Sequence, residues 1–480
     1  MPFTINPIKF GTDGWRGLIA ADFTFDRVAK VAPLAALVLA ENYGNSVQKD
    51  RLVIVGYDRR FMADEFARVA AEAIKEAGFD VLLANNYAPT PALSWAAFSE
   101  KALGAIVITA SHNPAYYLGL KVKGAFGGSV APEITKQIEA KISAPLPESQ
   151  SSGIIEKFDP WPGYCSELRS KVNIDAIKIA IAQREINIYA DVMHGAAATG
   201  LQRLLDCEIK ELNGDRDPLF GGGSPEPLPR YLSDLFLTIK TAAQIGTGLR
   251  IGLVFDGDSD RIAAVDGLGN FLSSQILIPI LIEHLTKNRG FTGEVVKTVS
   301  GSDLIPKVAK YYNCSVCETR IGYKYIADRM LSNEVLIGGE ESGGVGYGNH
   351  IPERDALLSA LYLLEAIVAS KKDLRQLYKQ LQEVTNFTSA YNRIDLPLAT
   401  MKVRDRLIER LKNDRPTKIA GLEVVDCLSL DGYKFRLSDN SWLLIRFSGT
   451  EPVLRLYCEA ATDAKVTKTL NWAKNWANAG

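Results

Sequence analysis

Short apolar runs alternate with amphipathic stretches over most of this chain. In the first third, apolar runs at 51–56, 80–84 and 105–109 each end in polar residues or glycine, a pattern typical of buried strands. Stretches at 26–40 and 63–77 carry apolar residues at helical spacing, and Pro89-Thr-Pro91 is expected to open a third helix. Strands that alternate with helices predict a mixed or parallel α/β sheet.

The alternation returns twice after a linker at 144–153. The second segment predicts strands at 186–191 and 250–255 and helices at 196–205 and 232–247. The third predicts strands at 294–298, 315–319 and 334–337 and helices at 274–286, 303–312 and 354–370. Both segments therefore predict α/β domains like the first.

The last segment has a different pattern. Strands expected at 423–429, 434–437, 442–447 and 453–460 follow one another closely, between a helix at 400–412 and one that begins near residue 464. This order predicts an antiparallel α+β unit. We therefore expect four domains, at 1–150, 151–265, 266–385 and 386–480.

The run at 105–109 leads directly into Ala110-Ser111-His112-Asn113-Pro114. Proline cannot continue a strand ladder, and it restricts the residue before it to extended or turn geometry. Ser111 is thus expected on a tight loop at the carboxyl end of a buried strand, where open α/β sheets bind ligands. A serine in that place is a candidate nucleophile or phosphate carrier.

Composition restricts the class of protein without identifying it. The 480 residues are 47% hydrophobic and 23% charged, and the net charge of −1 favours neither nucleic acid nor an acidic membrane. The six cysteines are too sparse for a disulfide framework, and Cys314-Ser-Val-Cys317 is expected to be a reduced strand segment, with redox or metal binding as the alternative. We see neither a signal peptide nor an apolar run of roughly 18 residues, and expect a cytoplasmic protein.

Three aspartates follow the strand at 250–255. Asp256, Asp258 and Asp260 place carboxylates at alternate positions of one turn, and such oxygen-rich sites suit Mg²⁺ or Ca²⁺. An EF-hand is excluded because Arg261 and Gly267 occupy the positions that need glycine and glutamate. We expect Mg²⁺ together with a phosphate ligand; the alternative is a solvated acidic turn.

Two further loops carry candidate binding groups. Gly338–Gly344 contains Glu340 and Ser342, which can accept hydrogen bonds from a polyol; a flexible acidic loop is the alternative. The second loop offers a guanidinium, two hydroxyls and a glycine, a combination that holds phosphate, with a plain hairpin turn as the alternative. Its candidate residues are Arg446, Ser448, Gly449 and Thr450.

A serine–histidine hydrolase is the rival interpretation of Ser111. His112 is its sequence neighbour, and neighbouring side chains in an extended loop point apart. No G-x-S-x-G elbow surrounds Ser111. A serine, a carboxylate-bound metal, a phosphate nest and a polyol loop, expected to converge on one cleft, instead predict phosphoryl transfer through a phosphoserine.

Five motifs in order resemble the α-D-phosphohexomutases, the family of phosphoglucomutase and phosphomannomutase. The resemblance covers essentially the whole chain. Thr109-Ala-Ser-His-Asn-Pro114 resembles the family's phosphoserine loop, Asp256-Gly-Asp-Ser-Asp-Arg261 its metal loop, Gly339-Glu-Glu-Ser-Gly343 its sugar loop, Arg446-Phe-Ser-Gly-Thr450 its phosphate-binding loop and Gly11-Thr-Asp-Gly-Trp-Arg-Gly17 its amino-terminal signature.

The resemblance implies three aconitase-like α/β domains and a carboxyl-terminal, TBP-like α+β domain around a central cleft. It implies a mutase that binds one Mg²⁺ per chain and carries phosphate on Ser111. The phosphoenzyme would convert a hexose 1-phosphate into a 1,6-bisphosphate, which would return its other phosphate to Ser111 and leave hexose 6-phosphate. Glucose 1,6-bisphosphate would thus be both intermediate and activator.

The resemblance also assigns roles by position. The metal ligands would be the phosphoserine oxygen of Ser111 and the carboxylates of Asp256, Asp258 and Asp260. Glu340 and Ser342 would hold sugar hydroxyls, and Arg446, Ser448, Gly449 and Thr450 the phosphate that is not transferred. Arg16, His112, Lys121 and Arg261 would surround the transferring phosphate. For Lys324 we expect acid–base catalysis or a sugar-phosphate contact, with a surface lysine as the alternative.

The choice of sugar depends on fewer residues. The Glu-Glu-Ser core resembles glucose-preferring members, so we expect glucose phosphates as substrate and mannose phosphates as a second activity. A phosphomannomutase, a phosphoglucosamine mutase and a glucose-1,6-bisphosphate synthase remain alternatives within the family. Outside it, the alternatives are a phosphoserine-forming phosphatase and a silent sugar-phosphate-binding protein. We expect a monomer or weak homodimer that binds no nucleic acid.

Overall fold

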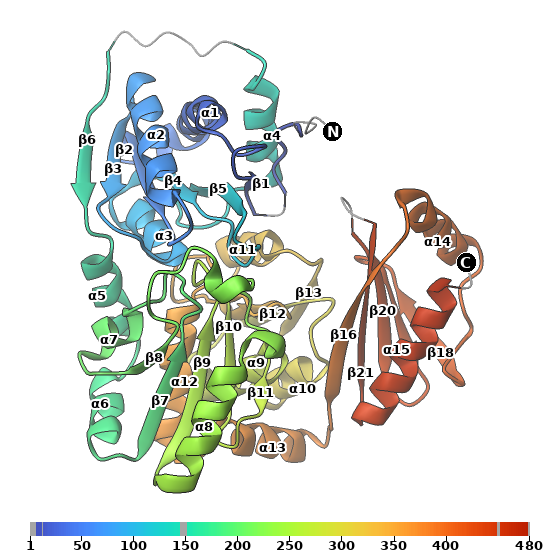
Figure 1. Cartoon of the computed structure of the whole chain (residues 1–480). Helices are drawn as coiled ribbons and strands as arrows, with labels where there is room; N and C mark the ends of the chain where they lie inside the picture. The colour runs from blue at the N-terminus through green and yellow to red at the C-terminus, as the bar shows by residue number, and fades with distance from the viewer. Residues whose placement is uncertain (1–5, 12, 145–150, 449–451, 479–480) are drawn as a thin grey trace.

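The computed structural model describes residues 6–11, 13–144, 151–448 and 452–478. These residues form four sheets, each with its own helices (Figure 1). Three sheets are mixed and the fourth is antiparallel, so the predicted fold class is confirmed: three α/β domains followed by an α+β domain.

The first domain, domain I, contains a six-stranded sheet in the order β1-β5-β4-β2-β3-β6. Its central strand β4 is buried at every residue, as the apolar run at 105–109 predicted. The strands are β1 Trp15–Leu18, β2 Lys49–Tyr57, β3 Asp80–Ala84, β4 Ala102–Ile108, β5 Tyr117–Gly124 and β6 Ile155–Phe158. The helices are α1 Phe25–Tyr43, α2 Ala63–Glu76, α3 Thr90–Ser99 and α4 Pro132–Lys141.

Domain II has a five-stranded sheet in the order β11-β10-β9-β7-β8. Strands β9 and β10 form an antiparallel hairpin, and residues 256–261 are its loop. The strands are β7 Ile186–Asp191, β8 Lys210–Leu212, β9 Leu249–Phe255, β10 Ile262–Val265 and β11 Phe271–Leu272. The helices are α5 Trp161–Lys171, α6 Ile174–Ala182, α7 Gly200–Leu205 and α8 Ser233–Ile245.

Domain III has a four-stranded sheet in the order β13-β12-β14-β15. Its loop at 340–344 joins the antiparallel pair β14 and β15. The strands are β12 Glu294–Thr298, β13 Val316–Thr319, β14 Val335–Gly339 and β15 Val345–Tyr347. The helices are α9 Ser274–Glu283, continued by a π-helical turn His284–Asn288, then α10 Leu304–Tyr311, α11 Tyr323–Ser332, α12 Ala356–Ser370 and α13 Leu374–Thr385.

Domain IV stands beside the other three and follows α13 through strand β16 (Figure 1). Its antiparallel sheet has the order β16-β21-β20-β19-β18-β17, and α15 packs on β16 and β21. The strands are β16 Ala390–Pro397, β17 Lys418–Ile419, β18 Leu422–Leu428, β19 Tyr433–Leu437, β20 Trp442–Phe447 and β21 Val453–Ala460. The helices are α14 Met401–Asn413 and α15 Asp463–Asn478.

The apolar cores do not correspond one to one with the four sheets. One continuous core takes in residues of domains I, II and III, from Leu52 through Ile188 to Leu361. Domain IV has a core of its own, built from residues 407 to 477. A small cluster in which Val299 contacts Trp442, Leu444 and Tyr457 joins domain III to domain IV.

Several elements differ from the expectation. The helix expected at 196–205 begins only at Gly200, because Thr199 before it has a left-handed backbone with φ of 62°. The sequence analysis did not predict strands β1, β5, β6, β8, β10, β11, β15, β16 and β17 or helices α4, α5, α6 and α13. The predicted domain limits at 150, 265 and 385 stay a prediction; β6 and β11, which lie just beyond two of them, pair with the preceding sheets. No helix among the described residues is long and apolar enough to cross a membrane.

Candidate active site

Ser111 lies three residues beyond β4, on a turn held by several hydrogen bonds. Its φ of 53° is in the left-handed region, which is strained for a residue with a side chain. The Ser111 N–H donates to the Thr109 hydroxyl at 2.9 Å, and that hydroxyl donates to Asp58 at 2.6 Å. Arg60 donates to the Ser111 carbonyl at 2.5 Å. These contacts fix the predicted loop and aim the serine hydroxyl.

The expectation that Ser111 and His112 point apart is wrong. The Ser111 Oγ and the His112 Nδ1 are 3.2 Å apart, because the loop is a left-handed turn and not an extended segment. Burial, and then the nearby guanidinium groups of Arg261 and Arg16, hold the pKa of His112 well below its usual value. The ring is therefore neutral at pH 7, and in the tautomer with an unprotonated Nδ1 it can accept the serine proton.

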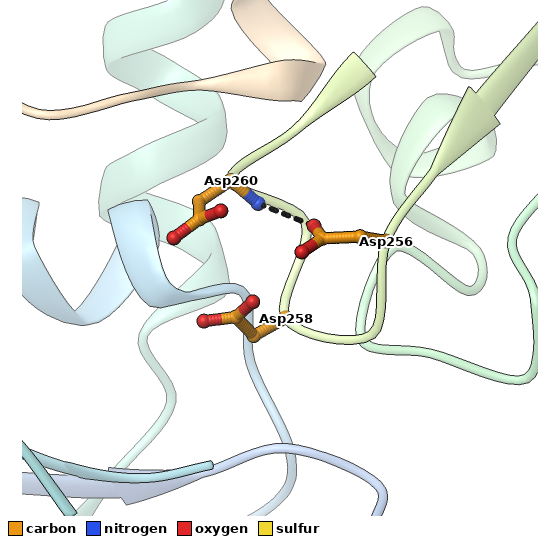
Figure 2. Close-up of side chains that lie close together, drawn as sticks. All are labelled: Asp256, Asp258 and Asp260. Atoms are coloured by element: carbon orange, nitrogen blue, oxygen red, sulfur yellow. Dashed lines mark hydrogen bonds between the residues drawn. The ribbon is translucent and has the colours of Figure 1, made fainter. Parts of the chain in front are cut away.

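The β9–β10 hairpin brings its three aspartates to the same place. Carboxylate oxygens of Asp256, Asp258 and Asp260 lie within 4.8 Å of one another, and the three buried side chains turn toward one side of the loop (Figure 2). Ser111 Oγ donates to Asp256 at 2.8 Å, so the serine loop and the predicted metal loop meet. A Cβ at Gly257 would lie 2.5 Å from the Ser111 carbonyl, so only glycine permits this approach.

The electrostatics of the aspartate cluster suit a cation. Burial, and then Asp260 and Asp258, raise the pKa of Asp256 well above its usual value. For Asp258, burial acts in the same direction, but the Lys121 ammonium outweighs it and lowers the pKa. One buried oxygen each of Asp258 and Asp260 has no hydrogen-bond partner. Carboxylate oxygens without a hydrogen-bond partner, beside a serine hydroxyl, match the hard-oxygen ligands that Mg²⁺ takes in proteins.

Lys121 comes from β5 and is almost fully buried among these carboxylates. Its ammonium lies 2.8 Å from Asp258, 2.8 Å from Asp260 and 2.6 Å from Asp13. Asp13 belongs to the amino-terminal loop and was not among the predicted site residues. A carboxylate between glycines in a loop that also supplied Arg16 was the available signal.

Arg354 is a second site residue that the sequence analysis missed. Its guanidinium donates to Asp13 at 2.5 Å and to Asp260 at 2.7 Å, and lies 3.8 Å from Glu340. Arg354 thus connects domain III to domains I and II at one point. The signal was a cluster of charged residues, Glu353 to Asp355, directly before the apolar helix α12.

The predicted arginines of the phosphate site lie beside the serine loop. Arg16 donates to the Asn113 side chain at 2.6 Å, and Arg261 follows the last aspartate, with its Nε 3.9 Å from an Asp260 oxygen. Both guanidinium groups act on the His112 ring. The structure therefore gathers Arg16, His112, Lys121 and Arg261 around Ser111, although they come from two domains.

The predicted sugar loop pairs with the metal loop. Ile262 donates its N–H to the Gly343 carbonyl at 2.9 Å, and Gly343 has a φ of 101°, which favours glycine. Glu340 is buried and accepts the Gly322 N–H at 3.1 Å, while Ser342 lies partly exposed in the turn. Both predicted sugar contacts therefore lie next to the aspartate cluster.

The predicted phosphate loop is described in part. Arg446, on β20, lies with its Nε 3.2 Å from Asp431, and the buried Ser448 pairs its N–H with the Val453 carbonyl at 3.0 Å. Gly449 and Thr450 lie outside the described residues. Arg446 and Ser448 thus belong to domain IV, and they are not part of the cluster around Ser111.

Lys324 lies in the first turn of α11. It lines a small pocket between domains I and III together with Gly11, Asp13 and Ser129. Its ammonium lies 5.1 Å from the ring centre of Tyr325. Asp13 of this pocket also pairs with Lys121. The expected catalytic or sugar-phosphate role of Lys324 stays a prediction.

Comparison with known proteins matches almost the entire chain to one family. Four family models match in order, described as the domains I, II, III and the C-terminal domain of phosphoglucomutase/phosphomannomutase. The matched residues are 7–147, 162–269, 273–384 and 405–471.

Individual relatives agree on the class and differ in their names. A crystal structure provisionally named phosphomannomutase, from Thermus thermophilus, is 33% identical and superposes with a TM-score of 0.85 over 99% of this chain and 100% of the other. A Thermococcus kodakarensis phosphoglucomutase/phosphomannomutase is 27% identical over 96% of both chains. A Sulfurisphaera tokodaii phosphoglucosamine/phosphogalactosamine mutase is 28% identical over 97% of this chain and 98% of its own.

The fold and the serine–aspartate site define an enzyme of phosphoryl transfer. The chain belongs to the phosphoglucomutase/phosphomannomutase family, the α-D-phosphohexomutases. Members of this family are Mg²⁺-dependent isomerases that transfer a phosphoryl group, and the buried aspartates could bind that metal.

Proposed function

We propose that this protein interconverts glucose 1-phosphate and glucose 6-phosphate through a phosphorylated Ser111. The observation that carries the proposal is the 2.8 Å hydrogen bond from the Ser111 hydroxyl to Asp256, one of three clustered aspartates. A hydroxyl fixed beside a predicted cation site, with cationic side chains around it, suits the storage and transfer of a phosphoryl group.

In the forward direction, the sugar 6-hydroxyl attacks the phosphorus of phosphoserine, and the bond from phosphorus to Ser111 Oγ breaks. The products are hexose 1,6-bisphosphate and a free serine. After the bisphosphate turns over, Ser111 Oγ attacks the 1-phosphate, and hexose 6-phosphate leaves. Each transfer moves one proton, from the attacking hydroxyl to a base and from an acid to the leaving oxygen.

The side chains around Ser111 divide the tasks. We assign to His112 the uptake of the Ser111 proton in the second transfer and its return in the reverse direction; its neutral ring and the 3.2 Å separation support this role. Arg16 and Arg261 supply charge for the phosphoryl oxygens. Asp256, Asp258 and Asp260 would hold Mg²⁺ together with a phosphoserine oxygen, and the metal would supply charge neutralisation on the transferring group. We assign acid–base catalysis at the sugar hydroxyl to Lys324 as a prediction.

The other end of the substrate has its own candidate groups. Glu340 and Ser342 are proposed to accept hydrogen bonds from sugar hydroxyls. Arg446 and Ser448, with Gly449 and Thr450 of the same loop, are proposed to bind the phosphate that is not being transferred. Because the bisphosphate carries phosphate at both ends, one distal site serves both of its orientations.

The choice of sugar rests on the Glu-Glu-Ser core of the sugar loop. We propose glucose phosphates as the main substrate and mannose phosphates as a second one. The names of relatives also include phosphoglucosamine mutases, so glucosamine 1-phosphate is the competing substrate. A protein that releases its bisphosphate would instead act as a glucose-1,6-bisphosphate synthase.

A coupled assay tests this proposal. Wild-type protein with Mg²⁺ and a trace of glucose 1,6-bisphosphate is expected to convert glucose 1-phosphate to glucose 6-phosphate. Ser111→Ala is expected to be inactive, whereas Ser170→Ala, on an exposed face of α5, is the matched control and retains activity. Equal activity of Ser111→Ala and wild type would contradict the role of the serine. Mannose and glucosamine 1-phosphates in the same assay rank the sugars.

A further inference from the structure

The two adjacent glutamates of the sugar loop face different domains. Glu340 turns back into domain III, where it accepts the Gly322 N–H and lies near Arg354. Glu341 turns toward domain IV, and its Oε1 lies 2.6 Å from the guanidinium of Arg393 on β16. Only 8% of the Glu341 side chain is exposed. The Glu341 carboxylate of the Glu-Glu-Ser loop is therefore paired with another domain.

Arg393 is prepared to receive it. Its other nitrogens donate to both carboxylate oxygens of Asp395, at 2.8 and 2.5 Å, and its guanidinium lies 5.5 Å from the ring centre of Tyr457. Burial lowers the pKa of Arg393, but Asp395 and Glu341 outweigh it and raise the pKa, so the side chain is charged at any working pH. The two hydrogen bonds to Asp395 fix the orientation of the Arg393 guanidinium, so little conformational entropy is lost when it pairs with Glu341.

The sheet of domain IV connects this pair to the phosphate loop. Asp395 on β16 is directly opposite Arg455 on β21, and Arg455 is directly opposite Arg446 on β20. The three residues form one row across neighbouring strands. Because the strands are joined by backbone hydrogen bonds, a shift of β16 against the sugar loop also shifts Arg446.

A second contact joins domain IV to domain III close to these loops. Asp431 of domain IV lies 3.2 Å from Arg446 Nε and accepts the Ile321 N–H of domain III at 3.0 Å. The next N–H, that of Gly322, is the one that Glu340 accepts. Two sets of contacts therefore fix the position of Arg446 relative to the sugar loop: the Glu341–Arg393 pair and the contacts of Asp431.

We propose that Glu341 and Arg393 are positioning residues that dock domain IV on the sugar loop, and that Glu341 does not recognise the sugar. This inference rests on the proposed function, in which Arg446 binds the distal phosphate while Glu340 contacts the sugar. It has a specific consequence: loss of the pair weakens binding of every hexose phosphate by the same factor, because the shared phosphate is misplaced and the sugar contacts are not.

The first test compares neutral variants of the two glutamates. Glu341→Gln is expected to raise KM about three- to thirtyfold, the range typical of a coupled ion pair, by one common factor for glucose, mannose and glucosamine 1-phosphates. Arg393→Gln is expected to do the same, and the double variant to be no worse than either single one. Glu340→Gln is expected to change the ratio between sugars. A changed ratio in Glu341→Gln, or effects that add in the double variant, would overturn the proposal.

The second test needs no turnover. Hydrogen–deuterium exchange of the full-length protein is expected to increase in both 390–397 and the paired strand 453–460 when Glu341→Gln is introduced. Glu100→Gln, which breaks an exposed ion pair with Lys49, is the control and leaves both segments unchanged. Unchanged exchange in Glu341→Gln would overturn the docking role. If wild type converts no hexose phosphate, the proposed function fails, while this exchange result still decides the docking role.

Discussion

The junction of domains I, II and III and the boundary between domains III and IV are built differently. At the junction, an apolar core continues through three domains, and Lys121 and Arg354 are only 1% and 5% exposed among carboxylates. At the boundary near the phosphate loop, domain IV keeps a separate core, and its Arg393, whose side chain is 32% exposed, pairs with Glu341 of domain III.

The difference follows from what each region has to do. Buried ion pairs cost several kcal/mol to break, so the junction holds the serine, the aspartates and their cations in one geometry. The Arg393 side chain at the boundary is partly exposed, so its pair with Glu341 is expected to cost less to break than the buried pairs of the junction. Elsewhere on this boundary, buried Glu459 of domain IV accepts hydrogen bonds from Trp442 and from Ser302 of domain III.

The largest effect is expected from breaking the junction itself. Arg354→Ala leaves Asp13 and Asp260 without their shared cation, and should lower the free energy of unfolding by about 3–5 kcal/mol. Urea-induced unfolding measures the loss. Arg68→Ala, which breaks an exposed ion pair with Glu65 within α2, should lose much less. Equal losses in the two variants would show that the junction is no more than a surface network.

Removing one metal ligand should act on the chemical step. Asp258→Asn weakens the cation site and is expected to lower kcat roughly a hundredfold or more, with a smaller change in KM. Added Mg²⁺ should restore part of the rate, and a chelator should abolish it in wild type. Asp234→Asn, an exposed aspartate of α8, is the control. An unchanged kcat and an unchanged Mg²⁺ requirement would remove Asp258 from the site.

A change on the domain IV side should act on binding instead. Arg446→Ala removes a charged hydrogen-bond donor from the distal phosphate and should raise KM about ten- to a hundredfold, with kcat little changed. Steady-state kinetics on glucose 1-phosphate separate the two parameters. A loss confined to kcat contradicts the proposed role of this arginine and the contrast between the two regions.

The smallest effect concerns His350, which is buried where α5 meets domain III. Burial lowers its pKa, but the carboxylates of Asp355, 3.3 Å away, and Glu167 outweigh it and raise the pKa above the usual value. The protonated ring therefore stabilises the folded state below about pH 6.5, and this contribution is lost as the pH rises through the folded-state pKa. The Tm should fall over that interval, and His350→Gln should remove the dependence.

Much of the fold could be predicted because its strands and helices leave local patterns in the sequence. The buried strand β4 and the hairpin aspartates follow from continuous apolar runs that end in polar loops. Ser111, Asp256, Asp258 and Asp260 could be found because each lies directly after such a run. Motif resemblance added Arg16, Lys121 and Arg261 as site residues, and it assigned roles to the polar loops already found in domains III and IV.

The remaining site residues depend on contacts between distant segments. Arg354 and Asp13 are 341 residues apart in the sequence, and no local pattern predicts that they form a pair. His112 lies beside Ser111 because the Ser111 backbone has a left-handed conformation, stabilised by the hydrogen bond from Arg60. The alternation of side chains along an extended strand does not predict such a turn. Likewise, Glu341 and Glu340 look equivalent in the sequence and differ only in the domain that each one faces.

The central claim is that Ser111 carries the phosphoryl group between the two ends of the sugar. Intact-protein mass spectrometry after incubation with glucose 1,6-bisphosphate and Mg²⁺ tests it most directly. Wild type should gain one phosphoryl group, the mass should return to its starting value when excess glucose 6-phosphate is added, and Ser111→Ala should gain nothing. A phosphoryl group that appears equally on Ser111→Ala, or that is lost to water at the same rate without sugar, would contradict the account.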